Sequence, residues 1–103
     1  MTSADPEGGL GEAVVVLARR AHERNVGRAR RIAELLSAPG APLDREVRDE
    51  AERLCHTVTG SASTFGDAEL AAAARHLEAA LHEGRDHDVP AALAALRAAA
   101  PPD

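Results

Sequence analysis

The sequence is poor in the residues that build β-sheets and aromatic cores. It has no tryptophan, no tyrosine and one phenylalanine, although hydrophobic residues make up 45% of its 103 positions. Most of that share is alanine, and β-branched apolar residues are scarce outside Val14–Val16. Alanine has the highest helix propensity, whereas strands favour β-branched and aromatic residues. The composition therefore predicts one small domain of closely packed helices.

Lysine is also absent, so the 12 basic residues are all arginine, and the formal net charge is −5. A negative balance argues against a general attraction to nucleic acid. The single cysteine excludes an internal disulfide. No stretch approaches the roughly 20 apolar residues that cross a membrane, and the N-terminus lacks the features of a signal peptide. We therefore expect a cytoplasmic protein without a membrane anchor.

The spacing of apolar residues predicts four helices and no strands. Residues 1–9 are acidic and contain glycine and proline, which indicates a disordered leader before a helical domain over 10–100. The helices are expected over roughly 10–37, 45–64, 68–83 and 89–99. The expected N-caps of the last three helices are Asp44, Asp67 and Asp88. Short connections between them predict an all-α, up-down antiparallel four-helix bundle.

The second of these helices has a well-defined apolar face. At about 100° per residue, one arc holds six apolar side chains that we expect to face the core. These are Val47, Ala51, Leu54, Val58, Ala62 and Phe65. His56 lies on the opposite side and is expected to point into solvent. Its face also carries Asp49, Glu52, Arg53, Gly60 and Ser63, with Thr59 at the margin.

Gly60 is unexpected inside a helix of so alanine-rich a chain, because glycine costs about 0.5–1 kcal/mol there relative to alanine. It follows His56 by one turn and lies beside it. A missing side chain next to an exposed imidazole leaves room for the surface of another protein. An ordinary surface histidine would also satisfy these observations, so the two residues alone do not identify a reaction.

The local sequence from His56 to Gly66 resembles the signature of the histidine phosphotransfer (Hpt) domains. That signature is a histidine followed at fixed spacing by an aliphatic residue, Gly, Ser, a small residue, an apolar residue and Gly. The matching residues are His56, Val58, Gly60, Ser61, Ala62, Phe65 and Gly66. The resemblance extends over roughly residues 12–99, including Leu77-Glu78 and Leu81 before Gly84.

This resemblance implies a phosphoryl carrier of a two-component phosphorelay, rather than a stand-alone enzyme. His56 would take a phosphoryl group from a receiver-domain aspartate, or from a histidine kinase pathway, and pass it on. The implied partners are response-regulator receiver domains, sensor histidine kinases or both, and the chain is expected to be monomeric, although its long first helix would allow a dimer. No cofactor of its own is implied, because Mg²⁺ would be bound by the receiver. The face that would dock the partner carries Glu52, Arg53, Thr59, Gly60 and Ser63.

One departure from the family pattern keeps an alternative open. Thr59 stands where these domains often carry a lysine, and Arg53 is the cation on the same face that would replace it. A domain that binds receivers without transferring phosphate is therefore a second hypothesis. A metal-binding or purely structural bundle is a third, prompted by five histidines. Their spacing lacks the i, i+4 pairing of helical metal ligands, so we expect no metal site.

Cys55 precedes His56, but adjacent residues on a helix diverge by about 100° and do not face each other. We therefore expect Cys55 to be a small residue at the boundary of the core rather than a nucleophile paired with His56.

Overall fold

The computed structural model describes residues 6–37 and 43–101, with side chains described from residue 11 onward. Within these ranges the chain forms four α-helices, a 3₁₀ turn and no strand, which confirms the predicted all-α class. The elements are α1 (Pro6–Leu36), α2 (Arg45–Thr64), α3 (Ala68–His82), the 3₁₀ turn (Asp86–Asp88) and α4 (Val89–Ala99).

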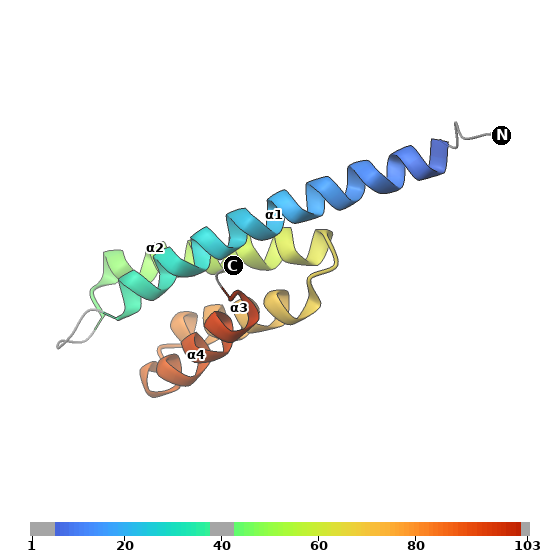
Figure 1. Ribbon diagram of the computed structural model, residues 1–103. Coiled ribbons are helices and arrows are strands. Elements are labelled where there is room, and N and C mark those ends of the chain that lie inside the picture. The colour runs from blue at the N-terminus through green and yellow to red at the C-terminus, as the bar shows by residue number, and fades with distance from the viewer. Residues whose placement is uncertain (1–5, 38–42, 102–103) are drawn as a thin grey trace.

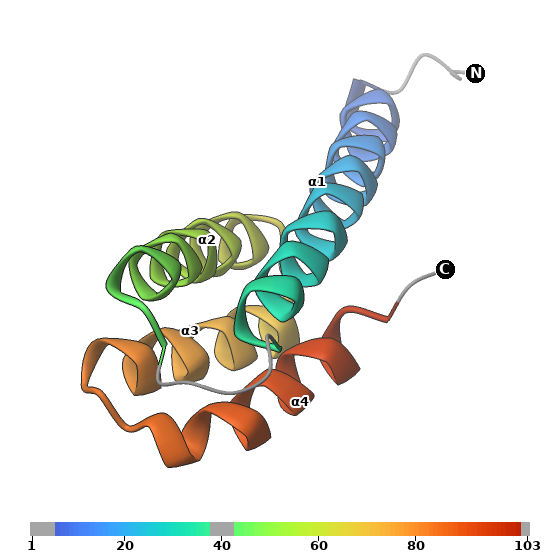
Figure 2. The same cartoon turned by 90° about the vertical axis from the view of Figure 1, so that its left-hand side faces the viewer.

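The helices pack as an up-down antiparallel bundle, as predicted. α2 packs against both α1 and α3, α3 packs against α4, and α4 returns to contact α1. Figure 1 shows α2 running back beside α1, and Figure 2 shows α3 and α4 as a second pair that closes the bundle.

The first helix is longer than the sequence predicts. α1 begins at Pro6, whereas we expected a disordered leader over residues 1–9; residues 1–5 of that leader lie outside the described part of the chain. Proline is favourable in the first turn of a helix because its φ is already helical and no hydrogen-bond donor is lost there. The helix also continues through Gly27 without a break.

Local sequence signals explain where the helices start and stop. Asp44 caps α2, and its Oδ1 accepts a hydrogen bond from the Glu46 amide at 2.9 Å. α2 and α3 end next to Gly66 and Gly84, whose φ values of 79° and 69° lie in the left-handed region that favours glycine. Because each helix stops sharply, the chain reverses direction within a few residues.

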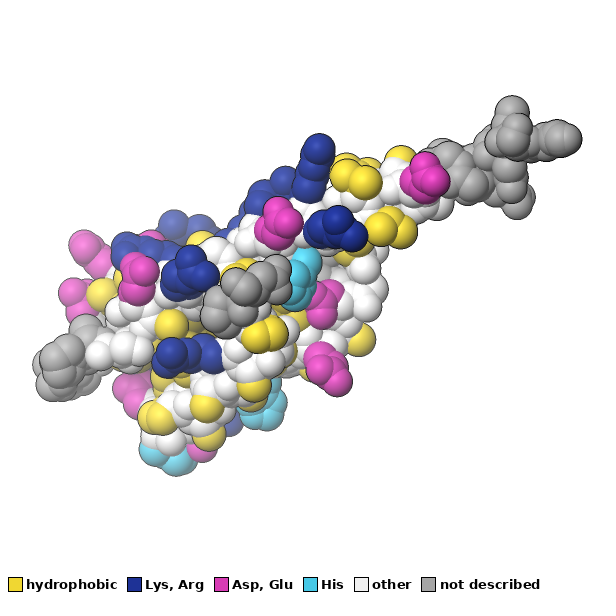
Figure 3. Space-filling model, in the orientation of Figure 1, with side chains coloured by type: hydrophobic (Ala, Val, Ile, Leu, Met, Phe, Trp, Pro, Cys, Tyr) yellow, Lys and Arg dark blue, Asp and Glu magenta, His cyan; other side chains and the backbone are white. Residues whose placement is uncertain are grey.

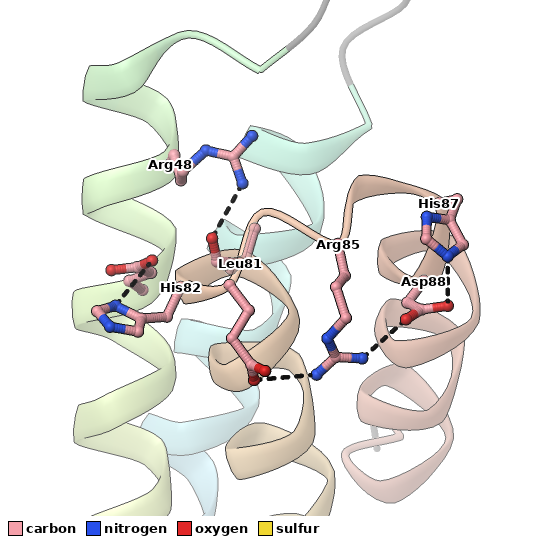
Figure 4. A network of polar contacts seen from close by, with 8 residues as sticks. Arg48, Leu81, His82, Arg85, His87 and Asp88 are labelled. Carbon is pink, nitrogen blue, oxygen red and sulfur yellow. Dashed lines mark hydrogen bonds and ion pairs between the residues drawn. The ribbon is translucent and has the colours of Figure 1, made fainter.

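The other two predicted N-cap positions are confirmed, but without the expected capping hydrogen bond. Asp67 and Asp88 precede α3 and α4, but neither side chain makes a capping hydrogen bond. Asp67 Oδ2 instead lies 2.8 Å from Nδ1 of His22, which joins the α2–α3 turn to α1. Asp88 Oδ2 accepts a hydrogen bond of 2.7 Å from Arg85 (Figure 4). The competing basic group is His22 on α1 for Asp67, and Arg85, three residues earlier in the chain, for Asp88.

The core is built from alanine and medium-sized aliphatic side chains of all four helices. Its largest fully buried members include Ile32, Leu70, Leu77, Leu81 and Leu96. On α2 the buried residues are Ala51, Cys55, Val58 and Ala62.

Two predictions about the α2 core face need correction. Cys55 is fully buried, so it belongs to the core and not to its boundary. Phe65 was expected to face the core, but it is only half-buried because it lies in the turn that follows α2. Val47 and Leu54 are also half-buried, at the edges of the same face.

Arg48 ties the start of α2 to the end of α3. Its Nη1 donates to the Leu81 carbonyl at 3.0 Å (Figure 4), and this carbonyl at the C-terminus of α3 also accepts from the Gly84 amide at 3.3 Å. Its Nη2 lies 2.9 Å from Oδ1 of Asp86. This contact fixes α3 beside α2, and therefore fixes which α3 side chains face the middle of α2.

Candidate functional site

His56 lies midway along α2, on the side away from the core. Its side chain is 80% exposed, whereas Cys55 before it and Val58 after it are fully buried. The ring therefore projects into solvent, as the helical spacing predicts. An imidazole in this position can be reached by a second protein without any change in the bundle.

The ring is not free of contacts, because Glu78 of α3 reaches it. Nδ1 of His56 lies 3.1 Å from Oε2 of Glu78, whose side chain is 29% exposed. An ionised carboxylate only accepts hydrogen bonds, so Nδ1 is the donor in this contact when Glu78 is ionised. That tautomer leaves Nε2 as the nitrogen with a free lone pair.

The surroundings of His56 are acidic. A shallow hollow beside the ring is lined by Asp49, Glu52, Arg53 and Glu78 together with His56 itself. Glu52 is half-buried, and its Oε1 lies 3.8 Å from Nδ1 of His82 on α3. Arg53 is exposed and is the single arginine among the lining residues. Arg53 is thus the cation of this hollow, whereas Thr59 does not line it.

Gly60 leaves an opening one turn beyond His56. A Cβ placed on Gly60 would meet nothing within 4 Å, so no described part of this chain fills the space. Ser63 is exposed nearby on the same helix. Thr59 is half-buried, and its hydroxyl donates to the Cys55 carbonyl at 2.9 Å, so it is turned toward its own helix. Of the predicted docking face, Arg53, Gly60 and Ser63 are exposed, while Glu52 and Thr59 are half-buried.

Cys55 takes no part in this surface. Burial raises the pKa of its thiol to about 12, and the nearby carboxylates of Glu78 and Glu52 add to the effect. The thiol is therefore protonated at neutral pH and inert as a nucleophile. This agrees with the prediction that Cys55 and His56 do not form a reactive pair.

The remaining histidines are dispersed. His22 contacts Asp67, and His87 lies 3.5 Å from its neighbour Asp88. Across residues 11–37 and 43–101, no group of three or more His, Cys, Asp or Glu side chains is arranged to hold a metal ion. The described side chains therefore give no support to the metal-binding hypothesis.

Comparison with known families identifies the class of protein. The family model described as "Hpt domain" matches residues 17–100, which is most of the chain. The chain is an Hpt domain. The match begins within α1 and covers the other three helices, so His56 lies inside the matched region.

Membership of the Hpt family places the chain among the histidine phosphotransfer components of two-component phosphorelays. Hpt domains are helical bundles that interact with receiver domains and histidine kinases. No curated protein and no solved structure matches this Hpt domain. In the described residues, none of its helices combines the length and the apolar character needed to cross a membrane.

Proposed function

We propose that His56 is the phosphoryl-accepting residue, and that it exchanges the group with the aspartate of a response-regulator receiver domain. The observation that carries this proposal is the 80% exposed imidazole, held at Nδ1 by Glu78 and bordered by the opening at Gly60. A receiver buries its aspartyl phosphate in its own active site, so the histidine must be the group that protrudes.

The contact with Glu78 supports Nε2 as the reacting atom. Because Glu78 holds the proton on Nδ1, the free lone pair is on Nε2. Nε2 attacks phosphorus in line with the aspartate oxygen, a bond forms between Nε2 and phosphorus, and the bond from phosphorus to that oxygen breaks. The aspartate leaves as a carboxylate, and no proton needs to move.

Glu78 also balances charge during the reaction. A ring that keeps its proton on Nδ1 and gains a phosphoryl group on Nε2 becomes a cationic imidazolium. The carboxylate 3.1 Å from Nδ1 stabilises that positive charge. Glu78 acts here as a positioning residue, because it touches the ring and not the phosphoryl group.

The receiver supplies the rest of the chemistry in this proposal. Phosphoryl transfer depends mainly on alignment and on neutralising the charge of the phosphoryl oxygens. Mg²⁺ bound by the receiver would neutralise most of that charge, and Arg53 is the nearest cation that this chain offers in the hollow beside His56. Docking would bring the receiver over Arg53, Gly60 and Ser63. We place this exchange in the cytoplasm, with sensor histidine kinases as the source of phosphoryl groups upstream.

Phosphotransfer from labelled receivers tests the assignment. Receivers carrying a radioactive aspartyl phosphate should label the chain in an acid-labile, base-stable way, as expected of phosphohistidine. His56→Gln should abolish labelling, whereas His76→Gln, which changes an exposed histidine of α3, should not. Label that persists in His56→Gln would show that the site is wrong. A wild-type chain that binds receivers but accepts no label would show that it is a non-catalytic docking domain.

A further inference from the structure

The N-terminal half of α1 continues beyond the rest of the bundle and carries apolar side chains that no other described part of the chain covers. From residue 11 onward, the first buried residue of α1 is Ala21. The four consecutive residues Val14, Val15, Val16 and Leu17 are 46–57% exposed. They lie on the part of α1 that projects past α2 and α3 in Figure 1, and hydrophobic side chains are visible there in Figure 3.

The face of α1 that packs inside the bundle extends into this projecting part. Residues seven apart lie on the same face of a helix. Val15 precedes the half-buried His22 by seven residues, and Ala18 likewise precedes the buried Asn25. Gly11 comes seven residues before Ala18. This side of α1 therefore continues over Gly11, Val15 and Ala18, where no helix among the described residues covers it.

The structure also shows where a covering helix would end. A hollow lies where the projecting part of α1 meets the α2–α3 turn. Val15, Ala18 and His22 line it on α1, and Phe65 and Gly66 line it on the turn. Phe65 is half-buried there, so part of the single aromatic side chain of this protein faces the hollow.

We propose that this face binds the same face of a second copy of the chain, with the two α1 helices antiparallel. A two-fold axis near Val15 and Val16 covers both exposed faces at once, because such an interface pairs a surface with itself. It also brings the projecting end of each α1 toward the hollow beside Phe65 of the other copy. The α1 helix of each copy then covers the exposed face on α1 of the other copy.

Charge favours the antiparallel direction. Glu12 and Arg19 are seven residues apart, so they lie on the same flank of the apolar face. In an antiparallel pair related by a two-fold axis, this flank of one α1 lies against the same flank of the other α1. Glu12 of one copy then lies opposite Arg19 of the other, twice in each dimer. In a parallel pair this flank would instead face the opposite flank of the other helix, so Glu12 and Arg19 would not meet.

The size of the interface indicates a weak dimer. The projecting part, from Pro6 to Arg20, is about 22 Å long at 1.5 Å per residue. A pair of helices of that length, together with the two hollows, falls at the small end of specific interfaces. We therefore expect dissociation in the micromolar range. This proposal departs from the monomer expected from the sequence, and it does not depend on the function proposed for His56.

Sedimentation equilibrium of the chain over a range of concentrations tests the dimer. Val15→Glu should raise the dimer dissociation constant about tenfold or more, because each dimer would bury two unpaired carboxylates. Val16→Glu is the matched control: it makes the same change at the next residue, which lies at the same level of α1 and is also exposed, but is turned about 100° away from the paired face. It should leave the dissociation constant within about twofold, since rim charges contribute little.

Exchanging the charges tests the direction of the helices. Glu12→Arg or Arg19→Glu alone should each weaken the dimer by about threefold. The double variant Glu12→Arg/Arg19→Glu should restore it, which only an antiparallel pair predicts. A chain that is monomeric at all concentrations would overturn the proposal, as would equal effects of Val15→Glu and Val16→Glu. A monomer in which Val15→Glu weakens the binding of a receiver would assign this face to the receiver instead.

Discussion

At the scale of single residues, His56 and Glu78 show how one contact between helices can prepare a surface histidine for reaction. An isolated exposed imidazole has two tautomers and rotates freely. The 3.1 Å contact from Nδ1 to Glu78 selects one tautomer and restricts the ring. Because Glu78 comes from α3 and His56 from α2, the packing of these two helices sets the geometry of the proposed acceptor.

Phosphoryl transfer should therefore depend more on the negative charge of Glu78 than on the shape of its side chain. Glu78→Gln keeps an oxygen that can accept from Nδ1 but removes the negative charge. We expect transfer from a phosphorylated receiver to slow by about two- to fivefold, the range of a partly exposed charge pair. The equilibrium should shift toward the phosphorylated receiver by a similar factor, because the phosphorylated ring loses a counter-charge. Rapid-quench measurement of label on both proteins checks both values.

A control on the same helix separates this effect from a general change in charge. Glu69→Gln removes an exposed carboxylate of α3 that does not line the hollow beside His56. It should leave both the rate and the equilibrium unchanged. Equal behaviour of the two variants, or no effect of Glu78→Gln, would show that Glu78 does not position or stabilise the ring.

The sequence predicted His56 and its exposure, but not its partner or the buried polar contact between α1 and α2. The apolar spacing of α2 is enough to orient His56. Which α3 residue lies opposite depends on the register of α2 and α3, and Arg48 helps set that register through contacts 33 and 38 residues away in sequence. Asn25 is buried and donates to Ser61 Oγ at 3.2 Å. No pattern in the neighbouring sequence predicts the contact of His56 with Glu78 or that of Asn25 with Ser61.

At the scale of the element, Gly60 makes the α2 helix less stable than an alanine would, but it leaves space for a partner protein beside His56. Nothing lies within 4 Å of a Cβ built at Gly60, so a side chain fits there without a clash. Gly60→Ala should then raise the free energy of unfolding by about 0.5–1 kcal/mol, the helix preference of alanine over glycine. Gly60→Leu should leave the fold intact but weaken receiver binding, because the side chain would fill the space beside His56. Thermal unfolding and titration with a receiver measure the two effects.

Gly27 provides the matched control for this substitution. It is also an exposed glycine inside a helix, and a Cβ built on it meets nothing within 4 Å, but it lies on α1. Gly27→Leu should stabilise its helix without affecting receiver binding. Unchanged affinity in Gly60→Leu would show that the opening has no role in docking.

The helices themselves were the most predictable elements, and their ends less so. The bounds of α2 agree with the prediction, because Asp44 and the Phe65-Gly66 turn act within one or two residues of the helix. Asp67 and Asp88 hold the predicted N-cap positions, but their side chains do not cap, because His22 and Arg85 compete for their carboxylates. Caps depend on neighbours in space, whereas glycine turns depend mainly on the local backbone.

At the scale of the whole molecule, the absence of lysine and tyrosine makes the alkaline titration of the chain unusually simple. Between about pH 9 and 12 the only side chain expected to lose a proton is the thiol of Cys55. Burial holds the pKa of that thiol at about 12 in the folded chain, above its ordinary value of 9.0. The unfolded chain therefore releases this proton first, and the folded chain retains it.

Stability should consequently fall as the pH rises from about 9 toward 12. In that window the unfolded state binds fewer protons than the folded state, so the free energy of unfolding decreases with pH, by about 1 kcal/mol per pH unit at most. Below pH 9 both states hold the proton, and the effect disappears. Urea unfolding followed by circular dichroism at pH 8, 9, 10 and 11 measures the slope. Cys55→Ala should remove it, since no other side chain titrates there. A slope that persists in Cys55→Ala would mean that the loss of stability has another source than the buried thiol.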